Sequence, residues 1–443
     1  MTKEELKQKT VSAISLGCDK NRVDLEHMLF ALSDYGFNIT TELSEANIII
    51  VNTCAFIQPA IEEAIENIVL ALSQKSEGKA EKVIVSGCLP MREKEEIEKL
   101  FPDVDAFMSL NDNPNVISII EGLYGLANSG YKFKPTGRII TNQGGYAYLK
   151  IAEGCSNGCA YCTIPRIRGR FRSIPKKEIL QEATSLVKKG YQELILVAQD
   201  TARYGEDIFG KPNLVDLLQD LVKIKGLKWI KLQYIYPEWV SIELLEFINS
   251  QPKMCKYLDI PLQHIDNHIL RAMNRKTDED HTRKLIKLIR NNFPEIVLRS
   301  TFIVGFPTEK KREFNRLCDF IREGHFPYAS FFAYSKEEKT KAYYMHGHVP
   351  NFIKKRRLKK IFELQNIVIN QFLKEQLGKI TEVMIDDYYS DEQIFVGHQK
   401  NASPDVDLKV VFPLENNSSL RIGEIYNVKL VEINEFGFKG EIL

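Results

Sequence analysis

Residues 153–162 read Glu-Gly-Cys-Ser-Asn-Gly-Cys-Ala-Tyr-Cys, and this loop decides how the rest of the chain is interpreted. It places three thiols, those of Cys155, Cys159 and Cys162, at C-x3-C-x2-C spacing after an apolar run at 147–153 that predicts a strand. Thiolates are the ligands of iron-sulfur clusters, and glycines let a short loop wrap round a bulky inorganic core. Three ligands on a four-iron cluster leave one iron open, so the loop predicts a cluster that can bind a substrate.

Structural zinc is the competing interpretation of these thiols. Zinc normally closes its tetrahedron with a second Cys or His pair. No such pair follows Cys162 within about 30 residues, the distance over which zinc ligands usually recur. We therefore favour the iron-sulfur interpretation.

The segment that contains this loop, 143–374, repeats a strand followed by a helix. Further apolar runs predict strands at 193–199, 228–234, 256–260, 297–304 and 328–333, and amphipathic stretches predict helices at 176–189, 278–291 and 311–323. Six such units predict a partial (β/α)6 barrel, whose chemistry is expected at the carboxyl ends of its strands. A helix from about Asn351 leaves this barrel and carries six basic residues: Lys354, Lys355, Arg356, Arg357, Lys359 and Lys360.

Polar residues in the barrel strands are candidates for holding a cofactor. Gln199 and Asp200 end the second strand, and Arg299 lies in a later one, where inward polar groups can bind a ligand. Ordinary hydrogen bonding within the barrel explains each of them equally well. Four arginines that follow the cysteine loop could offset the negative charge of a cluster, although a solvated loop is the commoner explanation: Arg166, Arg168, Arg170 and Arg172.

The first segment, 1–142, alternates short apolar runs with helical patterns, which predicts a parallel sheet covered by helices. Strands expected at 11–17, 47–53 and 82–87 each run directly into a cysteine, namely Cys18, Cys54 and Cys88. Ligands of an open parallel sheet bind outside the carboxyl ends of its strands, so the three thiols can converge on one site. A single buried cysteine is commonly just an apolar residue, but the same placement after three strands favours a shared metal site.

The last segment, 375–443, consists of short alternating runs separated by Gly, Asn, Asp and Pro, which predicts a small antiparallel β-barrel. The whole chain is therefore expected to be an α/β protein of three domains. They are an N-terminal parallel α/β domain at 1–142, a partial barrel with a linker helix at 143–374 and a β domain at 375–443. Cys255 and Cys318 have no metal-like neighbours in sequence, and Cys318 lies on an apolar helical stripe.

Composition places the chain among soluble folded proteins. It has 443 residues, of which 44% are hydrophobic and 27% are charged, and its formal net charge is +1. The first residues are charged and polar, and no long apolar run follows, so the sequence shows no sign of a signal peptide or a membrane span. We therefore expect a cytoplasmic protein. Eight cysteines in such a chain favour metal ligands or core residues over disulfides. A net charge this close to zero does not produce an overall positive potential that would attract nucleic acid.

The cysteine loop resembles that of the radical S-adenosylmethionine superfamily, and the order of the three domains resembles the methylthiotransferases over essentially the whole chain. Five stretches are similar to the RimO branch, which acts on ribosomal protein S-twelve: 15–21 (Ser-Leu-Gly-Cys-Asp-Lys-Asn), 52–57 (Asn-Thr-Cys-Ala-Phe-Ile), 199–201 with 204–205, 258–264 and 298–301. Two positions depart from the branch pattern. Asp19 stands where proline is usual, and 305–310 (Gly-Phe-Pro-Thr-Glu-Lys) lacks the usual Gly-Glu-Thr ending.

This resemblance implies two four-iron clusters and S-adenosylmethionine as cofactors. It implies that a cluster on the 155–162 loop reduces S-adenosylmethionine to methionine and a 5'-deoxyadenosyl radical, which removes hydrogen from the β-carbon of an aspartate. An auxiliary cluster on Cys18, Cys54 and Cys88 would provide sulfur that a second S-adenosylmethionine methylates, and the product would be β-methylthio-aspartate. The implied partners are ribosomal protein S-twelve, free or on the small ribosomal subunit, and a one-electron reductant such as flavodoxin or ferredoxin. The resemblance also implies that the C-terminal β domain of this chain is of the TRAM type.

Two alternatives stay open at the level of sequence. One is a tRNA methylthiotransferase that modifies the adenosine next to the anticodon with the same clusters, and the other is a noncatalytic RNA-binding module. From Glu375 onward there are six Lys or Arg and thirteen Asp or Glu residues, a net charge of 6 − 13 = −7. Because phosphate binding draws on Lys and Arg, an acidic domain favours a basic protein as the substrate.

Overall fold

A computed structural model describes residues 1–417 and 419–443, without the side chain of Asn416. It divides into two compact units, which are described separately. The N-terminal unit comprises Met1–Thr141, Glu153–Asn157 and Cys162–Ser185, and the barrel unit comprises Asn142–Ala152, Gly158–Tyr161 and Leu186–Leu443. The three predicted domain boundaries stay a prediction.

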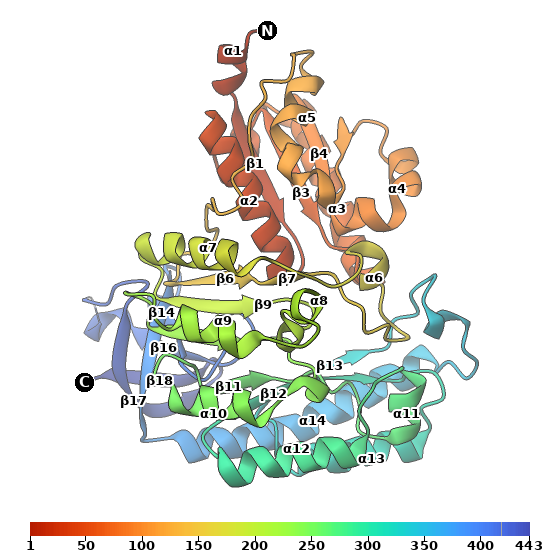
Figure 1. The fold of residues 1–443 in the computed structure, drawn as a ribbon, viewed down its shortest axis with the longest axis vertical. Coiled ribbons are helices and arrows are strands. Elements are labelled where there is room, and N and C mark those ends of the chain that lie inside the picture. Colours follow the sequence, from red (N-terminus) through yellow and green to blue (C-terminus); the bar gives the residue numbers. More distant parts are fainter. Residues whose placement is uncertain (418) are drawn as a thin grey trace. The chain divides into compact units, whose positions relative to one another are not determined.

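The N-terminal unit contains the predicted parallel sheet, in the order β2-β1-β3-β4-β5. Figure 1 labels three of its strands, β1, β3 and β4. Its strands are β1 (Thr10–Ser15), β2 (Asn38–Ile39), β3 (Ile48–Thr53), β4 (Lys82–Gly87) and β5 (Ala106–Phe107). Every pair of neighbouring strands is parallel. The central strand β3 is buried along its whole length and apolar from Ile48 to Val51, as is typical of a strand covered on both faces.

Helices cover both faces of this sheet. The helices of the unit are α1 (Lys3–Lys7), α2 (Asp19–Tyr35), α3 (Gln58–Glu77), α4 (Cys88–Leu100), α5 (Val116–Leu123), α6 (Ile164–Ile167) and α7 (Lys176–Lys188). Side chains of α2 and α5 pack with Ile48 and Ile50 in one core, whereas those of α3 and α4 pack with Ile49 and Val51 in the other. This alternation follows from the two-residue period of a strand. Helix α2 begins at Asp19, so Cys18 is its N-cap residue.

The barrel unit contains six parallel strands in two groups of three. Their orders are β10-β9-β6 and β11-β12-β13. The strands are β6 (Tyr146–Lys150), β9 (Glu193–Val197), β10 (Trp229–Leu232), β11 (Tyr257–Asp259), β12 (Val297–Val304) and β13 (Tyr328–Ala333). Backbone hydrogen bonds from Cys255 N to Ile230 O (2.8 Å) and from Ile235 N to Asp259 O (2.9 Å) join the groups, which confirms the partial (β/α)6 barrel.

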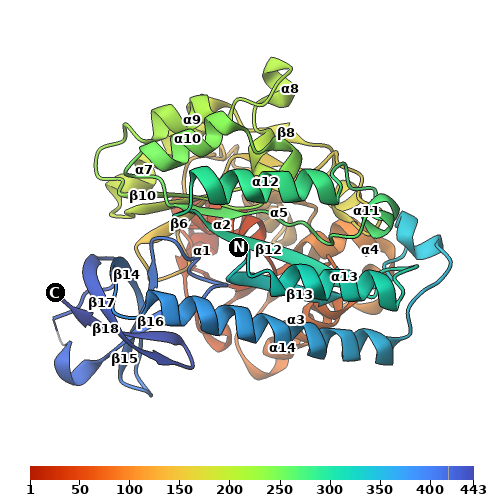
Figure 2. The same ribbon diagram turned by 90° about the horizontal axis from the view of Figure 1, so that it is seen from below.

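Among the described residues of this unit, five longer helices lie between barrel strands: α9 (Leu214–Leu221), α10 (Ile242–Ser250), α11 (Asn267–Ala272), α12 (Glu279–Asn292) and α13 (Lys311–Arg322). A sixth helix, α14 (Asn351–Gln376), follows the last strand, β13. A shorter helix is α8 (Glu206–Phe209). Strands β7 (Ala152–Glu153) and β8 (Arg172–Ser173) form a separate two-stranded sheet. Figure 2 shows α14 running beside α13 and β13 toward the C-terminal strands. None of the described helices combines the length and the apolar run that a membrane span requires.

The C-terminal strands close into the predicted small barrel. They are β14 (Ile380–Tyr389), β15 (Ile394–Gln399), β16 (Lys409–Pro413), β17 (Ile425–Asn434) and β18 (Gly437–Ile442), in the order β14-β15-β16-β18-β17. All pairs are antiparallel except β16 with β18, which is parallel. Closure leaves no free strand edge, and Phe412 and Phe438 fill the interior.

Candidate metal centres

Three of the predicted thiols meet at the carboxyl edge of the N-terminal sheet. Cys18 is the N-cap residue of α2, Cys54 follows β3, and Cys88 is the first residue of α4. The pKa of the Cys88 thiol is raised to about 12, mainly by burial and also by the neighbouring thiols of Cys18 and Cys54, against the lowering effect of Arg168. Burial also raises the pKa of Cys54, with a further contribution from Cys18. The three sulfurs therefore lie close enough to interact.

Glycines allow the three strand ends to approach one another. A Cβ atom on Gly17 would lie 2.6 Å from Cβ and 2.9 Å from Sγ of Cys54, and the φ of Gly17 is +86°. A Cβ atom on Gly87 would lie 2.4 Å from the carbonyl oxygen of Thr53. Glycine is the residue that permits both the left-handed backbone and this close approach. The resulting cradle carries three thiols in a small space.

Polar side chains fix the loops that carry these thiols. Asn21 donates from Nδ2 to the carbonyl oxygen of Leu16 (2.8 Å), and Asn52 donates from its own Nδ2 to the carbonyl oxygen of Asn21 (2.8 Å). Thr53 donates from Oγ1 to the carbonyl oxygen of Ser86 (2.6 Å). These bonds tie the ends of β1, β3 and β4 to each other, so the cysteines are held on a rigid edge.

A buried arginine lies beside this edge. Arg168 is 5% exposed, and its Nη2 lies 3.7 Å from Sγ of Cys88. Its Nη1 donates to Asp24 (3.0 Å) and to both carboxylate oxygens of Glu153 (3.1 Å). Arg166, Arg170 and Arg172 are exposed, which matches the interpretation as a solvated loop, whereas Arg168 has the electrostatic position that the sequence offered only as an alternative.

The cysteine loop at 153–162 spans the junction between the two units. In the N-terminal unit, Cys155 is buried and donates its backbone N–H to the carbonyl oxygen of Gly169 (3.1 Å), and Cys162 is half-buried. Gly154 has a φ of +72°, and a Cβ atom on it would lie 2.3 Å from the carbonyl oxygen of Arg170. The loop therefore needs glycine at this position, as its composition predicts.

Cys159 lies in the barrel unit, beside groups from the carboxyl ends of two strands. Its Sγ is 3.7 Å from the hydroxyl of Tyr236, which follows β10, and 3.7 Å from Nη1 of Arg275. Arg275 also donates to the carbonyl oxygen of Pro261, which follows β11, and stacks 4.2 Å from the ring centroid of Tyr236. The motif did not reveal Tyr236 or Arg275, because both come from distant loops.

The three candidate cofactor residues have different surroundings. Gln199 follows β9, and its amide nitrogen and oxygen are both buried without a hydrogen-bond partner among the described residues. Asp200 is fully buried. Arg299 is the third residue of β12, far from its carboxyl end, and donates to Asp407 (3.1 Å) and Ser330 (2.7 Å). A cofactor role for Arg299 would require breaking these contacts.

The described residues contain no group of three or more His, Cys, Asp or Glu side chains placed to hold a single metal ion. A four-iron cluster is larger than one ion and holds its thiolates farther apart, so its fit rests on the shared edge and the glycine cradle. Cys255 and Cys318 are buried, and burial raises the pKa of each thiol, to about 12 for Cys255. Both match the expectation of core residues.

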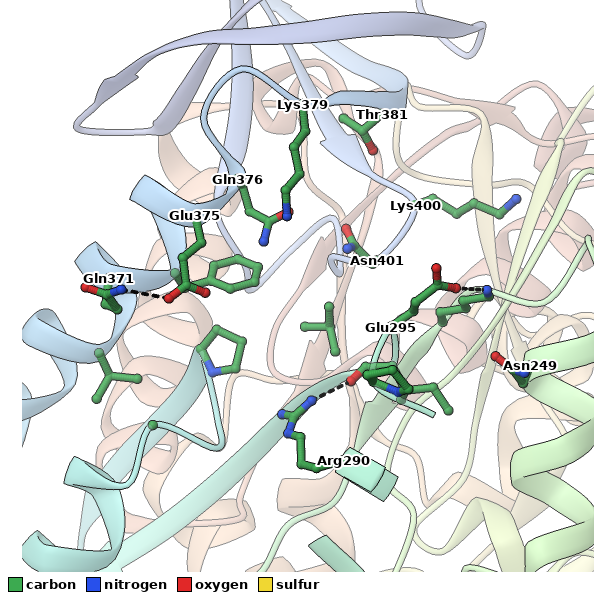
Figure 3. A pocket seen from close by; sticks show the side chains of 18 of the residues that line it. Asn249, Arg290, Glu295, Gln371, Glu375, Gln376, Lys379, Thr381, Lys400 and Asn401 are labelled. Atoms are coloured by element: carbon green, nitrogen blue, oxygen red, sulfur yellow. Dashed lines mark hydrogen bonds and ion pairs between the residues drawn. The ribbon is translucent and has the colours of Figure 1, made fainter. Parts of the chain in front are cut away.

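A separate pocket of about 1250 Å³ lies at the opposite ends of the barrel strands. Its lining includes residues that precede β11 and β12, the last turns of α14, and Lys379 and Lys400 of the C-terminal segment (Figure 3). Its charged groups bond to protein atoms: Arg290 donates to the carbonyl oxygen of Ile296 (3.0 Å), and Glu375 accepts from Gln371 (2.7 Å). This pocket contains none of the predicted site residues.

Three parts of the chain match known families. Residues 10–109 match an uncharacterized protein family, UPF0004, residues 149–321 match the radical SAM superfamily, and residues 377–443 match the TRAM domain. Solved structures share the fold at low identity. TsrM, a radical S-adenosylmethionine methyltransferase from Kitasatospora setae, aligns with a TM-score of 0.53 and 13% identity over 74% of this chain and 75% of its own. OxsB, a cobalamin-dependent S-adenosylmethionine radical enzyme, aligns with a TM-score of 0.52 and 11% identity over 82% and 57%.

Curated relatives match nearly the whole chain. The ribosomal protein uS12 methylthiotransferase RimO of Elusimicrobium minutum (strain Pei191) is 42% identical over 435 residues, which cover 98% of this chain and 99% of that protein. The protein of the same name from Clostridium botulinum (strain Eklund 17B / Type B) is 40% identical over 440 residues, which cover 98% of each chain. With the radical SAM and TRAM matches in the expected places, the chain belongs to the RimO family of methylthiotransferases and is a radical S-adenosylmethionine enzyme.

Proposed function

We propose that this enzyme converts an aspartate of ribosomal protein uS12, which is ribosomal protein S-twelve, to β-methylthio-aspartate. The observation that carries the proposal is the second set of three thiols, Cys18, Cys54 and Cys88, on one edge of the N-terminal sheet. A radical enzyme needs a single cluster to cleave S-adenosylmethionine, so a second cysteine set points to a separate task such as supplying sulfur. The names of the relatives give the protein substrate.

The six cysteines are the proposed cluster ligands. Cys155, Cys159 and Cys162 would hold the cluster that binds S-adenosylmethionine, and Cys18, Cys54 and Cys88 would hold an auxiliary cluster. Burial raises the pKa of Cys54 and of Cys88, so their thiolate forms need a nearby positive charge, and Arg168 beside Cys88 supplies part of it. The helix N-termini at Cys18 and Cys88 also favour the thiolate form.

The bound groups would supply the radical that removes a hydrogen atom from the β-carbon of the aspartate and the methylated sulfur that takes its place. The chain itself positions these groups. The unpartnered amide of Gln199 supports a hydrogen bond to bound S-adenosylmethionine, because a buried amide without a partner costs about 1–3 kcal/mol. Asp200 is the second proposed contact. A flavodoxin or ferredoxin would deliver the electron.

The protein assignment has a direct test against the tRNA alternative. Peptide mass spectrometry of uS12 and nucleoside analysis of anticodon loops are compared between cells with and without the gene. We expect the mass of one methylthio group on a uS12 aspartate only when the gene is present, with tRNA nucleosides unchanged. Unmodified uS12 together with loss of a methylthio-adenosine would overturn the proposal.

A further inference from the structure

Helix α14 has an inner face that is fully used within the barrel unit. Arg357 donates to a carboxylate oxygen of Glu309 (2.7 Å), and Lys354 donates to the carbonyl oxygen of Tyr334 (2.8 Å). Gln365 donates to the carbonyl oxygens of Phe326 and Pro327. These contacts fix the helix against β13 and α13, beside which it runs in Figure 2.

Four other cations in the first ten residues of the helix lie together on an exposed strip. We call this strip the basic face, and it consists of Phe352, Lys355, Arg356, Lys359 and Lys360. Phe352 is 71% exposed. None of the four cations forms an ion pair with a carboxylate among the described residues. Lys360 does lie 5.7 Å from the ring centroid of Phe314. The basic face is therefore a surface of unneutralised charge.

This distribution of charge lowers the intrinsic stability of the helix. The stretch Asn351–Lys360 holds six cations and no carboxylate, at the end of the helix where the macrodipole favours negative side chains. Lys355 with Lys359 and Arg356 with Lys360 are like charges four residues apart, which repel each other. The helix also lacks a side-chain N-cap. The N-terminal end of the helix thus carries positive charge that no carboxylate of the protein is seen to neutralise. Such a departure from the usual helix pattern points to a negatively charged binding partner.

The chemistry of the face selects the kind of anion. A row of Lys and Arg matches a phosphate backbone, and an exposed aromatic ring beside it can stack on an unpaired base. Phe362, at 44% exposure, extends the strip on one side. A basic ribosomal protein would be repelled by this surface. We propose that the basic face binds RNA, namely the ribosomal RNA beside the protein substrate on the small subunit, an inference that rests on the proposed function.

The test replaces the four cations of the basic face together: Lys355→Gln, Arg356→Gln, Lys359→Gln and Lys360→Gln. Binding of the reconstituted enzyme to purified small ribosomal subunits is measured at several salt concentrations. We expect weaker binding and a slope of log K against log salt that is smaller by about 3, since each lost phosphate contact removes about 0.7–0.9. Cleavage of S-adenosylmethionine should stay unchanged, and thermal stability should be equal or higher because helix-opposing charge is removed.

A matched control removes the same amount of charge from exposed helix positions elsewhere: Lys94→Gln, Lys99→Gln, Lys284→Gln and Lys287→Gln. It should keep the salt slope of the native enzyme. An equal loss of slope in the control, or an unchanged slope in the basic-face variant, would overturn the inference. A larger loss of binding to tRNA than to small subunits would assign the face to tRNA and overturn the ribosomal RNA assignment. Because binding is measured without turnover, these results are independent of whether uS12 proves to be the methylthiolated substrate.

Discussion

The two cysteine sites share one feature and differ in what surrounds it. At each site a buried arginine nitrogen lies 3.7 Å from a cysteine sulfur, Arg168 beside Cys88 and Arg275 beside Cys159. Arg168 is held by the carboxylates of Asp24 and Glu153. Arg275 has no carboxylate within ion-pair distance among the described residues, and its partners are a carbonyl oxygen and an aromatic ring.

This difference suggests that the two arginines have different roles. The charge of Arg168 is already offset by two carboxylates, so its main effect is to join the loop before Cys155 to the edge that carries Cys88. The charge of Arg275 is not offset by a direct ion pair among the described residues, so it can act on negative charge at Cys159. We expect Arg168 to govern stability and Arg275 to govern the ease of reducing a cluster on its loop.

The largest effect should follow from Arg168→Gln. This change removes the cation that Asp24, which is buried, and Glu153, which is half-buried, both contact, and losing one partner of a buried ion pair typically costs about 3–5 kcal/mol. The measurement is the urea midpoint of the reconstituted protein under anaerobic conditions. Adding Asp24→Asn and Glu153→Gln should recover part of the loss, because the orphaned charges are then absent. An unchanged midpoint in Arg168→Gln would show that the guanidinium does not join these loops.

Arg275→Gln should have a smaller effect on stability and a distinct effect on reduction. Removing a charge about 6 Å from a cluster changes its energy by roughly 3 kcal/mol at an effective dielectric constant of 20. The ratio of reduced to oxidised cluster at a fixed potential should therefore fall by about tenfold to a hundredfold. Redox titration followed by electron paramagnetic resonance measures this ratio, on a background in which Cys18, Cys54 and Cys88 are changed to Ala.

The variant Arg275→Lys keeps the positive charge, so it distinguishes the effect of charge on cluster reduction from the effect of packing. It should keep most of the native ratio, because an ammonium group retains the positive charge although it loses the stacking on Tyr236. Equal shifts in the Lys and Gln variants would assign the effect to packing and contradict the electrostatic account.

The smallest effect concerns a third buried charge group, at the junction of the two β-barrels. Burial lowers the pKa of His398, but Asp386 (2.6 Å) and Glu193 (2.7 Å) raise it overall above 6.5. Because the folded pKa exceeds the unfolded one, the imidazolium stabilises the fold at low pH, and this contribution is lost as the pH rises through the raised pKa. The ring of Trp229 lies 5.7 Å from His398, so tryptophan fluorescence reports the titration. His398→Asn should remove a transition whose midpoint lies above pH 6.5.

Strand topology made much of the N-terminal site predictable. Cys18, Cys54 and Cys88 each follow an apolar run, and parallel strands bring their carboxyl ends to one edge. The strands β12 and β13 also begin and end where alternation of apolar residues predicts. The short helices α9, α10 and α11 were missed, because six to nine residues carry too little periodicity to be distinguished from loops.

The sequence could not reveal which charges are used inside the protein. Four arginines alternate after the cysteine loop, and burial of Arg168 alone depends on tertiary packing. The acidic excess of the C-terminal domain is likewise not all surface. Asp386 is buried against His398 of its own domain, and Asp407 accepts from Arg299 and Tyr257 of the partial barrel, so both carboxylates are already bonded within the protein. Charge counting therefore gave weaker support for a basic substrate than the relatives do.

The central claim is that the chain holds two clusters on two separate cysteine sets. Iron, acid-labile sulfide and Mössbauer spectra are measured after anaerobic reconstitution of three proteins: the native chain, a Cys18, Cys54 and Cys88 to Ala variant, and a Cys155, Cys159 and Cys162 to Ala variant. We predict about eight iron atoms per native chain and about four in each variant, as four-iron clusters. The first variant should still cleave S-adenosylmethionine. About four iron atoms in the native chain, or loss of all iron in either folded variant, would contradict the two-cluster account.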